Sequence, residues 1–180
     1  MTKSIKLNAS NIISVKENID AEIKKYSHII RNENVMSNKA IKAGQGSGKD
    51  LKELYNLIQQ LRQKRIILKG MLQSLNMGIT TFDKEKFKTT NYYAIFAACE
   101  AKEDITLLKM IPTINPTLKA KKGLKNLGKQ ESFSSAKISQ LIHDRQLEAN
   151  KYDAILEKFN STTSIEIASE ISDFEMYLAA

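Results

Sequence analysis

Few side chains in this chain could perform nucleophilic or metal chemistry. Its one cysteine, Cys99, and its two histidines, His28 and His143, lie far apart in the sequence. Nucleophilic catalysis needs a base within hydrogen-bond reach of the thiol, and no spacing here predicts such a pair. One cysteine and two histidines also leave a tetrahedral zinc site incomplete unless carboxylates contribute. We therefore expect Cys99 to be a small buried core side chain, one turn beyond Phe96 in a helix.

Three carboxylates near the end of the sequence, Glu166, Glu170 and Asp173, follow one another at four- and three-residue spacing. In a helix this spacing places them on one side, where their oxygens could meet a hard cation. No neighbouring loop of Asp, Asn and Gly completes a cation cage, which favours a solvated acidic face. The sequence thus predicts no catalytic, cofactor or metal site, and we expect a protein that is not an enzyme.

The glycine-rich segment 43–50 reads Ala-Gly-Gln-Gly-Ser-Gly-Lys-Asp. It resembles the phosphate-binding loop of nucleotide hydrolases, which would imply nucleotide binding. The segment departs from that loop at Asp50, which replaces the Mg²⁺-binding hydroxyl and whose carboxylate would face the nucleotide phosphates. Residues 34–42 also lack the hydrophobic character of the strand that leads into such a loop. We interpret the segment as the glycine-rich tip of a helical hairpin.

Two groups of basic residues are candidates for contact with an anion, a nucleic acid or a partner protein. The first group is Arg62, Arg65 and Lys69, at helical spacing within residues 54–82, a stretch without any acid. The second lies within residues 105–130, which also contain no acid. Its candidate residues are Lys119, Lys121, Lys122, Lys125 and Lys129. Lysine exceeds arginine 24 to 4 in the whole chain, which favours diffuse electrostatic attraction over base-specific readout.

The elements that would position these groups are predicted to be helices. Apolar residues recur at three- and four-residue steps from Asn11 to Ile41, and a stricter 3.5-residue repeat begins after Asp50, a predicted N-cap. We call the apolar members of that repeat the leucine seam: Leu51, Leu54, Ile58, Leu61, Leu68, Leu72 and Leu75. Arg65 occupies one seam position, so its head must reach solvent or a carboxylate of another helix. Residues 1–78 are predicted to form an antiparallel helical hairpin, similar to a coiled coil.

Residues 79–180 are predicted to form a small helical bundle. One helical turn at residues 83–87 precedes a helix that begins at residues 89–91. The expected core side chains of that helix are Tyr92, Ile95, Phe96 and Cys99. A separate short helix, residues 103–111, should end before Pro112, because the residue that precedes a proline disfavours the helical region.

A basic segment of Pro, Gly and Lys residues, 112–130, interrupts this bundle. Helical spacing returns from Ile138 to Phe159, and Arg145 lies on the apolar side of that pattern. A last, acidic helix is predicted after Thr163, where a capping-box spacing occurs. No segment shows the alternation of a strand, so the predicted fold is all-α.

Composition narrows the classes of protein further. The chain has 180 residues, a formal net charge of +8 and 42% hydrophobic residues, enough for one real core. Its longest apolar stretch, residues 92–99, is far shorter than the roughly 18 residues of a membrane helix. The N-terminal residues lack the hydrophobic core of a secretory signal, and one cysteine cannot form an internal disulfide. We expect a cytoplasmic protein, in the host cytoplasm and the particle if it is viral.

Charge is unevenly distributed along the chain. Basic residues without acids fill residues 105–130, and acids without bases follow residue 159. Opposite charges in different regions could join copies head to tail. The predicted function is therefore that of a non-enzymatic structural or interaction protein, a subunit of a larger assembly such as a bacteriophage particle. Its partners would be other protein subunits, in an oligomer or hetero-assembly. The alternative is nonspecific nucleic-acid binding through the two lysine-rich patches.

Overall fold

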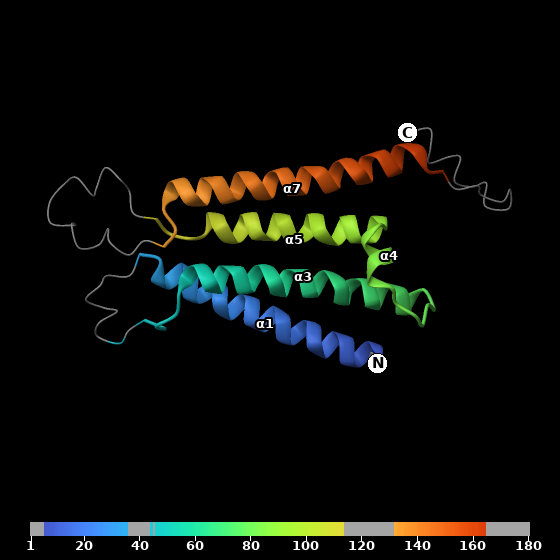
Figure 1. Cartoon of the computed structure of the whole chain (residues 1–180), viewed down its shortest axis with the longest axis horizontal. Coiled ribbons are helices and arrows are strands. Elements are labelled where there is room, and N and C mark those ends of the chain that lie inside the picture. Colours follow the sequence, from blue (N-terminus) through green and yellow to red (C-terminus); the bar gives the residue numbers. More distant parts are fainter. Residues whose placement is uncertain (1–5, 36–43, 45, 114–131, 165–180) are drawn as a thin grey trace, which may run out of the picture.

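The computed structural model describes residues 6–35, 44, 46–113 and 132–164, and this part of the chain is helical. Its helices are α1 (Ala9–Glu33), α3 (Leu51–Asn76), α4 (Lys84–Lys88), α5 (Asn91–Lys109) and α7 (Ser135–Thr162). The all-α prediction is confirmed. Helices α1 and α3 pack as an antiparallel hairpin, and α5 and α7 pack together as a second antiparallel pair (Figure 1). The predicted last helix and the five candidate lysines of segment 112–130 lie outside the described residues.

Helix ends follow the local signals in the sequence. The Asp50 side chain accepts a hydrogen bond from the backbone N–H of Lys52 at 2.8 Å, as an N-cap does. Helix α3 ends at Asn76, and Gly78 has a φ of 74°, in the left-handed region that favours glycine. Thr90 caps α5 through its hydroxyl. These boundaries agree with the predicted ones because caps depend on residues that are close in sequence.

The hairpin core contains the whole leucine seam. Five of its members are buried in the largest core cluster, and Leu72 and Leu75 pack against that cluster. Helix α1 contributes four isoleucines to the same cluster: Ile12, Ile19, Ile23 and Ile30. Val15, which has helical spacing with these residues, is instead 43% exposed. The cluster extends to Leu108 and Ile138, so the two helix pairs share one core.

Helix α5 differs from its prediction in two ways. It is one continuous helix from Asn91 to Lys109, where the sequence suggested two. Its expected core was also wrong, because Tyr92, Ile95 and Cys99 are exposed and Phe96 is only partly buried. The buried face instead consists of small and acidic residues: Ala94, Ala97, Ala98, Glu100, Ala101 and Asp104, with Ile105, Leu107 and Leu108. Small side chains let α7 approach closely, and its Ala149 is fully buried there.

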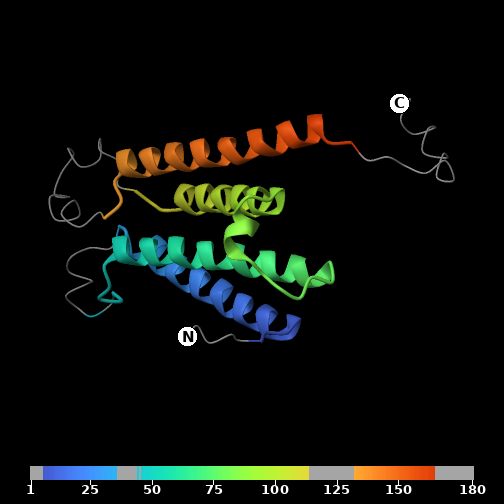
Figure 2. The ribbon, with the colours of Figure 1, turned by 45° about the vertical axis from the view of Figure 1, so that its right-hand side comes forward.

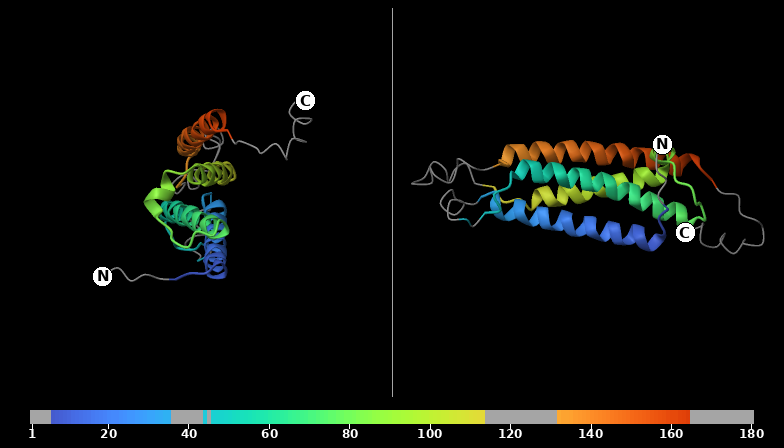
Figure 3. Two further views of the ribbon diagram at one scale, coloured as in Figure 1. Left: turned by 90° about the vertical axis from the view of Figure 1, so that its right-hand side faces the viewer. Right: turned by 60° about the horizontal axis from the view of Figure 1, so that its bottom comes forward.

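The four long helices form a staggered row. Seen along their axes, they follow one another in the order α7, α5, α3, α1 (Figure 3). The packed pairs are the neighbours in this row, and α4 is a short connection between α3 and α5 (Figure 2). Because α3 is displaced from the line of the row, α1 and α5 both lie on the same side of α3 (Figure 3). Among the described helices, only the short α4 lies against a broad face of the row, where its Phe87 packs with Ile66 of α3 and Ala97 of α5.

Asn34 fastens the end of α1 to the second pair of helices. Its amide nitrogen donates hydrogen bonds to the carbonyl oxygens of Pro112 and Phe133, each at 2.9 Å. Its amide oxygen accepts one from the backbone N–H of Phe133 at 2.8 Å. Pro112 and Phe133 lie on either side of segment 114–131. The buried Asn34 side chain therefore holds Pro112 and Phe133, which flank that segment, together at one end of the molecule.

A close approach between helices α3 and α4 generates a first prediction. A Cβ at Gly70 would lie 2.6 Å from two ring carbons of the buried Phe87. Gly70→Ala should therefore lower the free energy of unfolding by about 1 to 3 kcal/mol, as overpacking does. Urea denaturation followed by circular dichroism measures this change.

The control is the same substitution in a Phe87→Ala background. There the clash is gone, and alanine should stabilise the helix relative to glycine by up to about 1 kcal/mol. A loss of stability of equal size in both backgrounds would contradict the packing explanation.

Candidate functional site

Charged side chains are buried where α3 meets α5. The Glu100 carboxylate of α5 lies between Arg62, Arg65 and Lys69 of α3, and its side chain is only 5% exposed. Arg62 Nη1 donates to Glu100 Oε2 at 3.2 Å, and Arg65 Nε donates to Oε1 at 2.7 Å. Lys69 Nζ donates to Oε1 at 3.0 Å. Arg65 also bonds to Asp20 of α1 at 2.7 Å, so this network joins three helices.

Asp104, one turn further along α5, is the second buried carboxylate. Its Oδ2 accepts hydrogen bonds from the Tyr55 hydroxyl at 2.7 Å and from Gln59 Nε2 at 3.0 Å. Arg145 Nε of α7 lies 3.0 Å from the same oxygen. The other oxygen, Oδ1, lies 3.7 Å from Arg62 Nε. Asp104 thus brings α7 into the network that Glu100 forms with α3.

These contacts keep the network charged. Burial alone would raise the pKa of Glu100, but hydrogen bonds from Arg65 and Lys69 and their positive charges hold it below its ordinary value. Burial likewise opposes the charge of Arg65, whose pKa is nevertheless raised by its bonds to Glu100 and Asp20. Burial and the neighbouring Asp104 raise the pKa of Tyr55, which therefore remains a hydrogen-bond donor. The contacts therefore hold Glu100 and Arg65 in their charged forms.

In the structure, the residues of the first predicted basic patch contact acidic side chains of the same chain. Arg62 and Arg65 are buried against carboxylates, and Lys69 is mostly covered, with Phe96 beneath its ammonium group. The acid-free stretch of α3 is thus neutralised by acids of α5 and α1. Sequence reasoning missed Glu100, although its spacing of three from Ala97 placed it on the small-residue face of α5.

The glycine-rich segment is a connection between α1 and α3. Ser47 donates from its backbone N–H to Glu33 Oε1 at 2.8 Å, and its hydroxyl donates to Oε2 at 2.9 Å. Gly44 and Gly48 have positive φ angles of 75° and 70°. The backbone amide and the hydroxyl of Ser47 thus already donate to a carboxylate of the chain itself. This agrees with a hairpin tip, in which glycines permit the reversal.

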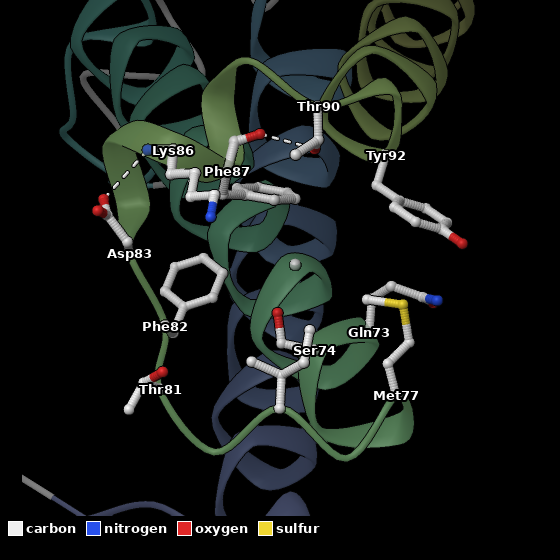
Figure 4. A pocket seen from close by; sticks show the side chains of 12 residues that line it. Gln73, Ser74, Met77, Thr81, Phe82, Asp83, Lys86, Phe87, Thr90 and Tyr92 are labelled. Carbon is white, nitrogen blue, oxygen red and sulfur yellow. Dashed lines mark hydrogen bonds between the residues drawn. The ribbon is translucent and has the colours of Figure 1, made fainter.

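A pocket of about 430 Å³ lies beside the C-terminal end of α3, below α4 (Figure 4). Phe82, Phe87 and Tyr92 contribute aromatic walls to it. Two of its polar groups are already used: Asp83 caps α4, and the Thr90 hydroxyl donates to the Phe87 carbonyl at 2.7 Å. The pocket therefore has the character of an apolar contact surface.

A larger groove, of about 840 Å³, lies between α1 and α5 and crosses α3. Its walls include Ala21, Ile29, Leu107 and Met110, and Arg62 lies at its base. Basic side chains of α1 stand along one rim. They are Lys24, Lys25, His28 and Arg31. The groove thus combines an apolar interior with a basic edge.

Neither a metal-ligand cluster nor a membrane-spanning helix is found in the part of the chain that the structure describes. Within the described ranges, no group of three or more His, Cys, Asp and Glu side chains is arranged to hold a metal ion. None of the helices that the structure describes is both long and apolar enough to cross a membrane. Comparisons with protein-family models, curated proteins and solved structures found no match for this chain.

The charge network predicts that Glu100 is far more important for stability than its neighbour Glu103. Glu100→Gln removes the carboxylate that Arg62, Arg65 and Lys69 share, and the remaining acids Asp20, Glu103 and Asp104 then compensate the buried cations only in part. The free energy of unfolding should fall by about 3 to 5 kcal/mol. Glu103→Gln is the matched control, because Glu103 contacts Arg65 but its side chain is 52% exposed. That substitution should cost about 1 kcal/mol or less. Equal losses in urea denaturation would contradict the buried network.

The network also predicts weakening in acid. The pKa values of Glu100 and Asp20 lie below their ordinary values of 4.5 and 3.8. Their contribution to stability is complete above those ordinary values and is lost as the pH falls through the lowered pKa values of the folded state. The free energy of unfolding should therefore decline below about pH 4.5. Glu100→Gln should decline less steeply, and an identical acid slope in both proteins would refute this assignment.

Proposed function

We propose that this chain is a non-enzymatic structural protein that acts as a subunit of a larger macromolecular assembly, such as a bacteriophage particle. The observation that supports this proposal is the single staggered row of four long helices (Figure 3). Most domains bury their apolar surfaces between two or more layers. A row whose faces are covered, within the described residues, by no helix except the short α4 gains its second layer most readily from another protein chain.

Exposed apolar side chains on the edge helices support the same proposal. On α1, Ile13 and Val15 are 44% and 43% exposed. On α7, Leu147, Ile155 and Phe159 are 55%, 43% and 41% exposed, and their spacing of eight and four places them along one side of the helix. Exposed apolar residues that gather on one side of a helix mark protein contact sites more often than scattered ones do. We call these three residues of α7 the α7 stripe.

The polar groups of the molecule also suit a structural role. The buried arginines and acids are engaged with one another between α3 and α5, where they hold the helices together. We propose that the assembly forms in the cytoplasm, because a chain with one cysteine gains nothing from an oxidising compartment.

The α7 stripe should be covered in the assembled state. Ile155→Asp combined with Phe159→Asp should leave the helical content unchanged, because both side chains are exposed, and should weaken assembly because charges enter an apolar contact. Multi-angle light scattering, on the chain alone and with its native partners, measures the mass against the 20.3 kDa of one chain.

The matched control introduces two acids at exposed polar positions of the same helix, Asn150→Asp and Asn160→Asp. It should assemble as the unchanged protein does. A chain that remains monomeric under every condition, alone and with its partners, would refute the proposed function.

A further inference from the structure

The groove between α1 and α5 has a charge pattern that selects one kind of occupant. Lys24, Lys25 and Arg31 are exposed along its α1 rim. The one acid among its lining residues, Glu103, is bound by Arg65 and lies 3.5 Å from Arg62. The free charge of the groove is therefore positive. An occupant with exposed carboxylates would be attracted to it.

The interior of the groove is apolar, so the same occupant should also present apolar side chains to it. Ile29, Leu107 and Met110 face it from α1 and α5, and Met110 is 47% exposed. A groove of about 840 Å³ lined by two helices, with apolar side chains in it, is the kind of surface used in helix-in-groove recognition. The complementary ligand is thus an amphipathic acidic segment.

The chain itself contains a segment with this pattern. Residues 165–180 include four acids and no base, and the acids are Glu166, Glu170, Asp173 and Glu175. Apolar residues recur among them at helical spacing, as Ile167, Ile171, Phe174 and Leu178. Glu166 and Asp173 are seven residues apart, as are Lys24 and Arg31 on the rim. With the segment as a helix, about two turns would separate Glu166 from Asp173, as they separate Lys24 from Arg31 on α1, so the charges would match in one register.

We propose that the groove between α1 and α5 binds the acidic segment 165–180 of a second copy of the chain. This inference rests on the proposed assembly function and gives it a specific contact. Helix α7 ends at the opposite end of the molecule from the groove (Figure 1). As a helix, the segment would span about 24 Å, whereas the 28 residues of α7 span about 42 Å. A neighbouring copy displaced along the long axis places the segment in the groove directly, in a head-to-tail contact.

Charge exchange between two full-length variants tests this contact. The groove variant is Lys24→Glu with Arg31→Glu, and the tail variant is Glu166→Lys with Asp173→Lys. Sedimentation velocity of each variant alone should show self-association at least about tenfold weaker than that of the unchanged protein, because like charges then meet. An equimolar mixture should associate again, since each variant presents the charge that the other lacks. The control, Lys64→Glu with Lys84→Glu, reverses exposed lysines outside the groove and should associate normally.

Several results would overturn the inference. Undiminished association of the groove and tail variants would overturn it and leave the proposed function standing, because copies would then join through another surface. A mixture that remains as weak as its components would overturn the second-copy contact. Unchanged protein that is monomeric alone but assembles with its native partners would overturn the groove contact only. A monomer under both conditions would overturn the groove contact and the proposed function together.

Discussion

The burial of the Glu100 carboxylate between α3 and α5 is the constraint on which the rest of the structure depends. A buried charge costs several kcal/mol unless cations and hydrogen bonds compensate it. Arg62, Arg65 and Lys69 meet that requirement from one helix, and Arg65 extends the network to Asp20 of α1. The two helix pairs must therefore meet in the one register that brings these groups together. Apolar contacts alone would tolerate a shift along the helix axes more readily.

Hydrophobic contacts then complete the interface on both sides of the charges. The largest cluster joins the leucine seam to Leu108 and Ile138, and a second cluster contains Ile66, Phe87 and Ala97. Small residues on α5 allow α7 to pack closely against it. The described helices thus form an elongated, flat body (Figures 1 and 3).

Much of this architecture follows from residues that are near one another in sequence. Asp50, Gly78 and Thr90 mark helix ends correctly, because caps and left-handed turns involve neighbouring backbone groups. The all-α fold follows from helical spacing and the lack of any strand-like alternation. The hairpin follows from the strict seam, since a 3.5-residue repeat requires a partner helix along its length. The position of Arg65 in the seam also predicted that its guanidinium group would reach either solvent or a carboxylate of another helix.

Contacts between residues that are distant in sequence decided which partners the charged side chains have and which face of α5 is buried. Periodicity placed Tyr92, Ile95 and Cys99 in the core, yet the adjacent face with Ala97, Glu100 and Asp104 is the buried one. A helix with apolar residues on several sides can bury any one of these sides. Which side is buried depends on the neighbouring helices, because one must compensate the acids and another must pack closely against the small residues. The groove between α1 and α5 likewise exists only because the stagger of the row brings them to the same side of α3. Charge and helical spacing are therefore local properties of the chain, whereas burial and the shape of a binding surface require the packed helices.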